Sequence, residues 1–191
     1  MASKDRVRWD STYKDYAGDP YPAPTPLLLQ FTPPAPDDQA RPYRALDIAA
    51  GRGQNGLWLA EQGYTVDLMD ISREGLLQAQ AEAARRGLRG LNFLQTDLEN
   101  VTLKPETYDL ICVIRYLNRD LFAQLRAAVR PGGRILYETF NRRYENVHKV
   151  FNKDYLLELG ELPGYFADWK IIHQQEPSHV SQVVAIKPRH E

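Results

Sequence analysis

The pattern of hydrophobic and polar positions changes near residue 44. From there on, short apolar runs alternate with longer segments in which apolar residues recur every three or four positions. Runs of the first kind are typical of strands buried on both faces, and the second spacing is typical of amphipathic helices. Because strands joined by helical crossovers form parallel sheets, the pattern predicts a doubly wound, Rossmann-like α/β fold.

Turn and cap residues mark the ends of these elements. Ser72 is a suitable N-cap, Gly63 and Gly87 suit helix ends, and Pro177 separates two closing strands that predict an antiparallel hairpin. The predicted strands are 45–49, 64–70, 91–95, 108–114, 134–140, 169–175 and 181–187. The predicted helices are 55–62, 72–86, 120–129 and 154–159. We therefore expect a mostly parallel sheet of about seven strands with a C-terminal antiparallel hairpin.

The first 43 residues follow a different pattern. Residues 4–16 are polar and charged with aromatic residues among them, and residues 20–36 are rich in proline. Proline fixes φ and removes a backbone donor, so a short helical turn at Leu27–Phe31 is the only regular structure expected among the prolines. We interpret residues 1–43 as an arm that covers the site of a domain formed by residues 44–191. A disordered tail is the alternative, and the aromatic and leucine content argues against it.

The bulk properties narrow the class of protein. The 191 residues suffice for one core, and the net charge of −1 lacks the basic excess typical of a general nucleic-acid binder. The single cysteine, Cys112, lies in an apolar run, where a small buried side chain is expected. The histidines are scattered, which predicts no metal site. Without a long apolar stretch or a secretory signal, we expect a soluble cytoplasmic protein that binds no membrane.

The segment between the first predicted strand and helix is rich in glycine. Gly51 and Gly53 let the backbone turn tightly and approach a ligand, and the following helix start offers unpaired N–H groups. Asp70 ends the second strand, where a carboxylate accepts hydrogen bonds from ribose hydroxyls. Asp97 and Leu98 follow the third strand, where they suit an adenine edge and ring. Together these strand ends outline an adenosine with a polar tail near Gly51.

The same loop satisfies the Gly-x-Gly-x-x-Gly pattern of dinucleotide-binding proteins. Two observations favour S-adenosylmethionine over NAD. Asp47 stands inside the first strand, where its carboxylate suits the ammonium group of a methionine and repels a pyrophosphate. The sequence also contains no Tyr-x-x-x-Lys pair for hydride chemistry.

The runs Leu46–Gly53 and Val66–Ser72, with Pro131-Gly132-Gly133 before the fifth strand, resemble class I S-adenosylmethionine-dependent methyltransferases over about residues 44–187. Within that group, the chain is similar to the small bacterial enzymes related to tellurite-resistance methyltransferases. The matching pieces are Trp9-Asp10 with Tyr13, residues 51–55, residues 115–118 and residues 137–140. This narrower resemblance assigns no acceptor.

The resemblance implies roles for the cofactor-contacting positions. It places the methionine part against Asp47, Gly51 and Gly53, the ribose against Asp70, and the adenine against Ile71, Asp97 and the Leu98 backbone, with Arg115 beside the sulfonium. The candidate set is completed by Ala49, Arg52, Asn55 and Ser72. Ala49 departs from the family, which usually has glycine there. Because alanine is the smallest replacement, we expect slight crowding and retained binding.

Catalytic residues are hard to identify from this sequence, because methyl transfer from a sulfonium mainly requires that the protein position the two reactants. A base is needed only where the acceptor must lose a proton. The candidates are Arg115 and Tyr116, after the fourth strand, and Glu138, in the fifth. Arg115 suits an anionic acceptor or the cofactor carboxylate, with a surface salt bridge as the alternative. Glu138 is expected to be buried and to need a partner, for which Arg115 is the candidate.

The acceptor site is assigned to Tyr116 and Asn118 and to two aromatic residues of the arm, Trp9 and Tyr13. For the arm, a lid over the acceptor and plain packing fit the pattern equally well. His148 is expected in a loop or at the surface.

The sequence thus predicts an S-adenosylmethionine-dependent methyltransferase that acts on a small-molecule acceptor held over the carboxyl ends of the strands. A non-catalytic protein that binds S-adenosylmethionine or a nucleotide is the alternative from another class. An NAD-dependent oxidoreductase is the enzymatic alternative. The acceptor and the oligomeric state stay open.

Overall fold

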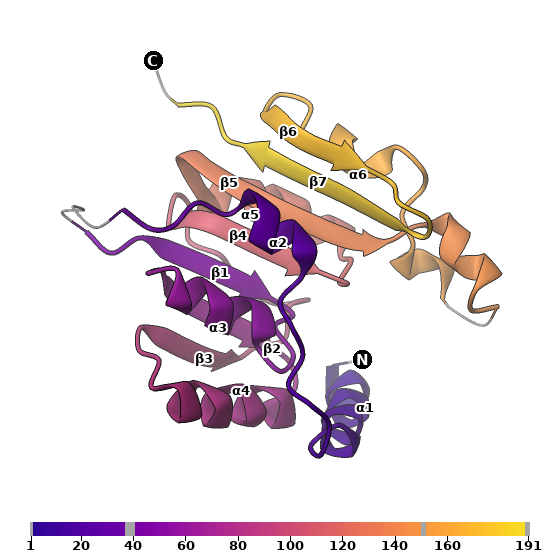
Figure 1. Ribbon diagram of the computed structural model, residues 1–191. Coiled ribbons are helices and arrows are strands. Elements are labelled where there is room, and N and C mark those ends of the chain that lie inside the picture. The colour runs from indigo at the N-terminus through magenta and orange to yellow at the C-terminus, as the bar shows by residue number, and fades with distance from the viewer. Residues whose placement is uncertain (1, 37–40, 150–151, 190–191) are drawn as a thin grey trace. The chain divides into compact units, whose positions relative to one another are not determined.

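The computed structural model describes residues 2–36, 41–149 and 152–189 (Figure 1). The chain divides into two compact units, Met1–Thr102 and Leu103–Glu191. Among the described residues, the strands of the first unit are ordered β3-β2-β1, and those of the second unit form a mixed arrangement ordered β4-β5-β7-β6. The α/β fold with a mostly parallel sheet is therefore confirmed.

The first unit holds three parallel strands, β1 (Arg44–Ile48), β2 (Thr65–Asp70) and β3 (Leu91–Gln95). The crossovers are the helices α3 (Gln54–Glu61) and α4 (Arg73–Arg86). Nearly every residue of β1 and β2 is buried, as expected for strands covered on both faces, whereas β3 is partly exposed. Because these strands are parallel, their carboxyl ends meet at one edge of the sheet.

The predicted helix ends of the first unit are confirmed. The Ser72 hydroxyl accepts a hydrogen bond from the amide of Gly75 at 3.1 Å, which makes Ser72 the N-cap of α4. Gly87 ends the same helix with φ +68°, and Gly63 follows α3 with φ +89°. Both conformations are left-handed, so glycine suits these positions.

The arm contains more helix than the sequence indicated. Residues Ala2–Asp15 form α1, with Asp5 in the first turn and Lys14 in the last, which is the favourable direction for the helix dipole. Figure 1 shows α1 beside the start of α4. The predicted helical turn is α2 (Pro26–Phe31), which begins at a proline and buries Leu28. That residues 1–43 act as a cover stays a prediction.

The second unit contains β4 (Tyr108–Ile114), β5 (Val129–Phe140), β6 (Lys170–Gln175) and β7 (Val180–Ile186). Strands β4 and β5 are parallel, and β7 runs antiparallel to both β5 and β6. The predicted C-terminal hairpin is therefore confirmed. The helix α5 (Phe122–Ala128) connects β4 to β5.

Two boundaries in the second unit differ from the prediction. Helix α5 is shorter than expected, because a 3₁₀ turn, η1 (Arg119–Leu121), precedes it. Strand β5 starts at Val129 instead of at Arg134, so it includes Gly132 and Gly133, which were expected to precede it. The amide of Gly132 donates to the Lys187 carbonyl at 2.9 Å, and the Lys187 amide donates to the Gly133 carbonyl at 2.8 Å. These bonds extend the pairing beyond the predicted strand.

The helix predicted at 154–159 is wrong. The segment has only a 3₁₀ turn, η3 (Lys153–Tyr155), and the short helix α6 (Glu161–Gly164) follows it. The amide of Leu157 donates to the Phe140 carbonyl at 3.0 Å, and the Leu157 carbonyl accepts from Arg142 at 3.0 Å. The backbone at Leu157 therefore pairs with the chain that leaves β5 instead of with a helical turn.

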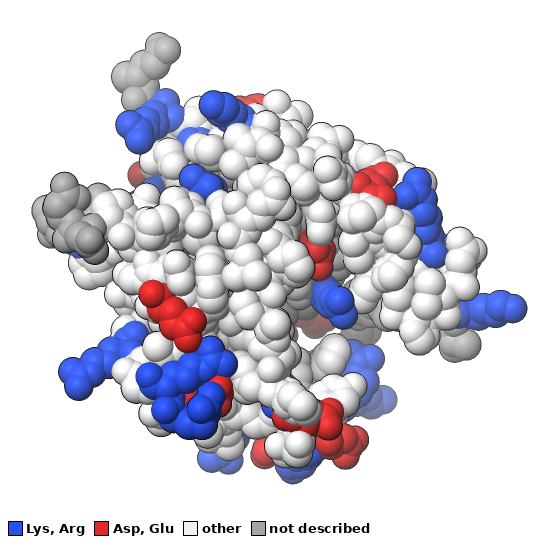
Figure 2. Space-filling model, in the orientation of Figure 1, with Lys and Arg blue, Asp and Glu red and all other residues white. Residues whose placement is uncertain are grey.

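Cys112 is fully buried within β4, as expected. On the face drawn in Figure 2, basic and acidic side chains are interspersed, which agrees with the small net charge. Among the described residues, no helix combines the length and apolar character needed to cross a membrane.

Candidate functional site

The glycine loop after β1 has the left-handed backbone that its glycines suggest. Gly51 and Gly53 have φ values of +57° and +80°, and Ala49 has φ +54°. A Cβ at Gly51 would lie 2.5 Å from the phenol oxygen of Tyr13. A Cβ at Gly53 would lie 2.7 Å from the side chain of Ala79. Both glycines are therefore required by conformation and by space, and Ala49 carries backbone strain where the family usually has glycine.

Asp47 is almost completely buried, and its Oδ2 accepts a hydrogen bond from the amide of Gly56 at 2.8 Å. Gly56 lies in the first turn of α3, so this carboxylate satisfies one of the free N–H groups at the helix start. Asn55 is also buried, and its Oδ1 accepts from the Thr25 amide at 2.9 Å. Asp47 thus fixes the loop to its helix, and Asn55 fixes the arm to the loop.

Asp70 joins the end of β2 to the glycine loop. One carboxylate oxygen accepts from the amide of Gly51 at 2.7 Å, and the other accepts from the amide of Ser72 at 2.7 Å. Burial raises the pKa of Asp70 above its ordinary value, although the two N–H groups favour the charged form. Each carboxylate oxygen retains a second lone pair, so the side chain can accept further bonds from a ligand.

The arm packs against this part of the first unit through α1. Asp10 accepts from the Ser72 hydroxyl at 2.6 Å and from the Glu74 amide at 3.2 Å, so it caps the start of α4. Tyr13 places its phenol against Gly51. Burial raises the pKa of Tyr13, and the nearby carboxylate of Asp70 raises it further. Tyr13 therefore lies against the predicted cofactor loop, and its assignment to the acceptor stays a prediction.

Trp9 stacks on Tyr13, with ring centroids 5.8 Å apart, and the Arg8 guanidinium lies 5.2 Å from the centre of the Trp9 ring. The Trp9 side chain remains partly open to solvent. The structure thus brings the two aromatic residues that were assigned to the acceptor together, beside the glycine loop.

The residues predicted to contact adenine occupy the ends of β2 and β3. The Ile71 carbonyl accepts from Gln95 at 3.2 Å, which ties the two strand ends together. Asp97 accepts from the side chain of Asn100 at 2.8 Å, within a local turn, and Leu98 is buried. Asp97 is therefore held in a fixed orientation by its own loop.

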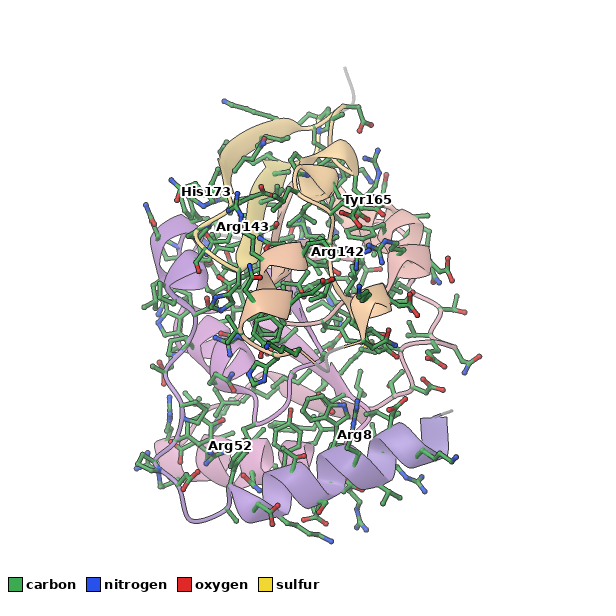
Figure 3. The ribbon with its side chains drawn as sticks, turned by 90° about the vertical axis from the view of Figure 1, so that its right-hand side faces the viewer. Arg8, Arg52, Arg142, Arg143, Tyr165 and His173 are labelled. Carbon is green, nitrogen blue, oxygen red and sulfur yellow. The ribbon has the colours of Figure 1, made fainter. Side chains whose placement is uncertain are left out.

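Tyr21 has a structural role that the sequence did not indicate. Its hydroxyl donates to the Arg52 carbonyl, and the guanidinium groups of Arg52 and Arg86 lie 5.3 and 5.1 Å from the centre of its ring. Arg52 also donates to the Asp19 carbonyl at 3.3 Å and lies next to α4 in Figure 3. These contacts join residues far apart in the chain, and no local motif signals them.

The second unit carries the remaining candidates. Arg115 follows β4 with φ +56°, and its amide donates to the Glu138 carbonyl at 2.7 Å. Its guanidinium lies 5.6 Å from the centre of the Phe140 ring. The buried carboxylate of Glu138 accepts from the Gln182 side chain at 2.6 Å. The expected pairing of the Arg115 and Glu138 side chains is therefore corrected, because the β5–β7 register places Gln182 directly opposite Glu138.

Tyr116 and Asn118 belong to the loop after β4. The Tyr116 carbonyl accepts from the hydroxyl of buried Tyr137 at 2.9 Å, and the Asn118 side chain accepts from the Asp120 amide at 3.0 Å. Both contacts fix the path of the loop. The acceptor-binding roles of Tyr116 and Asn118 stay predictions.

Comparison with known proteins agrees with the chemistry of these positions. Residues 45–133 match the family model described as a methyltransferase domain. A ubiquinone biosynthesis O-methyltransferase of Aliivibrio fischeri is 28% identical over 123 residues, which are 61% of this chain and 52% of that protein. The chain spans about half the length of the curated relatives it matches.

Solved structures share the fold. TehB from Haemophilus influenzae superposes with a TM-score of 0.66 and 18% identity, over 78% of this chain and 58% of TehB. An S-adenosylmethionine-dependent methyltransferase from Mesorhizobium loti gives a TM-score of 0.67 and 18% identity, over 85% and 96% of the two chains. At this identity the likeness concerns the fold alone.

The family match and the fold agree with the resemblance drawn from the sequence. The match covers the glycine loop, Asp70 and Asp97, and it implies S-adenosylmethionine as the cofactor. Over residues 45–133, this chain is similar to the methyltransferase domain family.

Proposed function

We propose that the protein transfers the methyl group of S-adenosylmethionine to a small-molecule acceptor. The observation that carries this proposal is the fixed carboxylate of Asp70, which accepts from the amides of Gly51 and Ser72 and so joins the end of β2 to the glycine loop. A carboxylate in this position serves the ribose hydroxyls of a nucleoside.

The electrostatic character of the loop favours a cationic ligand over a dinucleotide. The buried carboxylates of Asp47 and Asp70 flank the glycine loop, and the phenol of Tyr13 lies against Gly51. A pyrophosphate would be repelled by two carboxylates, whereas the ammonium and sulfonium groups of S-adenosylmethionine would be attracted. The residues present therefore fit the cofactor.

The cofactor-contacting roles follow from this fit. Asp47, Gly51 and Gly53 would hold the methionine part and Asp70 the ribose, while Ile71, Asp97 and Leu98 would enclose the adenine. The remaining positions frame the loop: Ala49, Arg52, Asn55 and Ser72. The bound cofactor supplies an activated methyl group, so this chain has to orient the two reactants and exclude water.

In the second unit, three residues are the candidates for binding the acceptor. Arg115, Tyr116 and Asn118 follow β4, and strand carboxyl ends are where open α/β sheets bind their ligands. Glu138 is held by Gln182, so it is oriented and available as a base where the acceptor must lose a proton. The relatives named as O-methyltransferases support a small-molecule acceptor.

Turnover separates this proposal from a non-catalytic binding protein. The purified protein would be incubated with S-adenosylmethionine and a panel of small-molecule acceptors, and formation of S-adenosylhomocysteine would be measured by mass spectrometry. We expect acceptor-dependent product, which Asp70→Asn reduces and Asp168→Asn, at an exposed position, leaves unchanged. Tight cofactor binding without product for any acceptor would favour the binding-protein alternative.

A further inference from the structure

A cluster of rings lies where the chain leaves β5 in the second unit. Phe140 ends β5, Tyr144 lies in η2 (Arg142–Asn146), His148 follows η2, and His179 lies in the turn between β6 and β7. The rings of Phe140 and Tyr144 stack with centroids 4.1 Å apart and planes 18° apart. Tyr144 lies 4.9 Å from His148 and 5.3 Å from His179. We call these four residues the ring cluster.

Hydrogen bonds fasten the three segments that carry the ring cluster. The amide of buried Asn141 donates to the His179 carbonyl at 3.0 Å, and its side chain caps η2 by accepting from the Arg143 amide at 3.0 Å. The Arg143 guanidinium, which Figure 3 labels, donates to the Ser178 carbonyl at 3.3 Å. The rings are therefore held by the scaffold, as in a preorganised binding site.

A cation faces the ring cluster. The exposed guanidinium of Arg115 lies over the Phe140 ring at 5.6 Å. Arg115 and Ser178 both have left-handed backbones, with φ +56° and +58°. Such conformations are costly for residues other than glycine and concentrate at ligand sites. Here both strained residues adjoin the same cluster, and Arg115 stands at the carboxyl end of β4, where this fold class binds ligands.

We propose that the ring cluster and Arg115 bind the methyl acceptor, and that this acceptor is a planar aromatic compound with an anionic group such as a carboxylate. Stacked rings offer flat apolar area for another ring, and a guanidinium pairs with a carboxylate through two parallel hydrogen bonds. An aliphatic acid would use Arg115 alone, and a neutral aromatic would use the rings alone. The assignment rests on the proposed function, which it deepens by naming a substrate class.

Binding can be tested with 4-hydroxybenzoate as the probe, using calorimetry and ligand-observed NMR on the full-length protein. Cyclohexanecarboxylate lacks the aromatic ring, and phenol lacks the carboxylate. We expect 4-hydroxybenzoate to bind about tenfold more tightly than either. Equal binding of the three compounds, or no binding of 4-hydroxybenzoate, would overturn the proposal.

Substitutions in the ring cluster and at Arg115 test whether 4-hydroxybenzoate binds there. Arg115→Gln and Tyr144→Leu should each weaken 4-hydroxybenzoate binding by about five- to tenfold. Tyr155→Leu removes a tyrosine of the same unit that is 44% exposed and lies outside the ring cluster, and it should leave binding unchanged. Circular dichroism shows whether each variant is folded. If one variant does not fold, the other still tests the site. Wild-type affinity in both folded variants would contradict the assignment.

A parallel titration with S-adenosylhomocysteine distinguishes failure of the acceptor assignment from failure of the proposed function. If S-adenosylhomocysteine binds and 4-hydroxybenzoate does not, the aromatic acceptor is wrong and the proposed function stands. If only 4-hydroxybenzoate binds, the ring cluster is not an acceptor site of a methyltransferase. Binding of both, with the expected variant effects, supports both.

Discussion

The carboxylate of Asp70 accepts a hydrogen bond from the amide of Gly51 across 19 residues of sequence, at 2.7 Å. This bond joins the end of β2 to the loop that follows β1. It holds Gly51 in its left-handed conformation, against the phenol of Tyr13. The predicted cofactor loop is thus fixed from two sides, by a carboxylate of the sheet and by a ring of the arm.

Gly51→Ala should destabilise the protein more than an alanine at another left-handed glycine. A Cβ at Gly51 would lie 2.5 Å from the Tyr13 hydroxyl, whereas Gly87, with φ +68°, has no atom within 4 Å of such a Cβ. Gly87→Ala should lower the free energy of unfolding by about 1–2 kcal/mol through backbone strain alone. Gly51→Ala should lose about 1–3 kcal/mol more, because of the clash. Urea denaturation measures the free energy of unfolding of both variants. Equal losses would show that the Tyr13 side chain moves away from the new Cβ at no energetic cost.

Ala49→Gly should stabilise the protein. The left-handed backbone of Ala49, φ +54°, costs about 1–2 kcal/mol, and glycine adds about 0.5–1 kcal/mol of unfolded-state entropy. We therefore expect the free energy of unfolding to rise by about 0.5–1 kcal/mol. The neighbouring Ala50→Gly, at a buried position without positive φ, should lower it. A loss of stability in both variants would mean that Ala49 is not strained.

Asp10→Ala should release α1 without unfolding the sheet. Asp10 accepts from Ser72 and from the Glu74 amide, and loss of such a cap costs about 1 kcal/mol. Hydrogen exchange of residues 2–15 should become about fivefold faster, while β1 and β2 keep their protection. Asp5→Ala is the control for losing a carboxylate of α1, because the pair of Asp5 with Arg8, at 3.3 Å, is exposed and lies within the helix itself. Equal exchange in the two variants would show that the cap does not anchor α1.

Glu82→Gln should destabilise the protein at neutral pH and much less in acid. Hydrogen bonds from Arg85, at 2.7 Å, and from Arg86 lower the pKa of Glu82 from 4.5 to about 2. Because the folded-state pKa is depressed, the stabilisation is present above about pH 4.5 and is lost as the pH falls toward 2. Thermal unfolding across this range should show the deficit of the variant shrinking with acidification. A deficit that does not change with pH would assign the loss to packing.

The alternation of strands and helices was predictable because buried elements have a local pattern of apolar residues in the sequence. The apolar run of β4 and the turn residues around β3 placed both strands at their observed bounds. Helix α1 has no such local pattern, and distant contacts hold it in place. Asp10 and Tyr13 contact Ser72 and Gln78, more than 60 positions away in the chain, at hydrogen-bond distances of 2.6 Å in both cases.

The same reason explains the errors at the candidate site. The cofactor loop could be found because glycine and aspartate at strand ends form a local pattern. The partner of Glu138 could not be found, because it depends on the register between β5 and β7. The false helix at 154–159 has an ordinary helical spacing, and the bridge between Asn141 and Leu157 overrides it.

The proposed function requires that the glycine loop and Asp70 bind S-adenosylmethionine. This binding can be measured by calorimetric titration of the purified protein with S-adenosylhomocysteine, with NADH in a parallel cell. We predict micromolar binding of S-adenosylhomocysteine, no binding of NADH, and affinity at least about tenfold weaker in Asp70→Asn, where an amide donor would face the N–H of Gly51 or Ser72. Binding of NADH without S-adenosylhomocysteine, or unchanged affinity in a folded Asp70→Asn, would contradict the account.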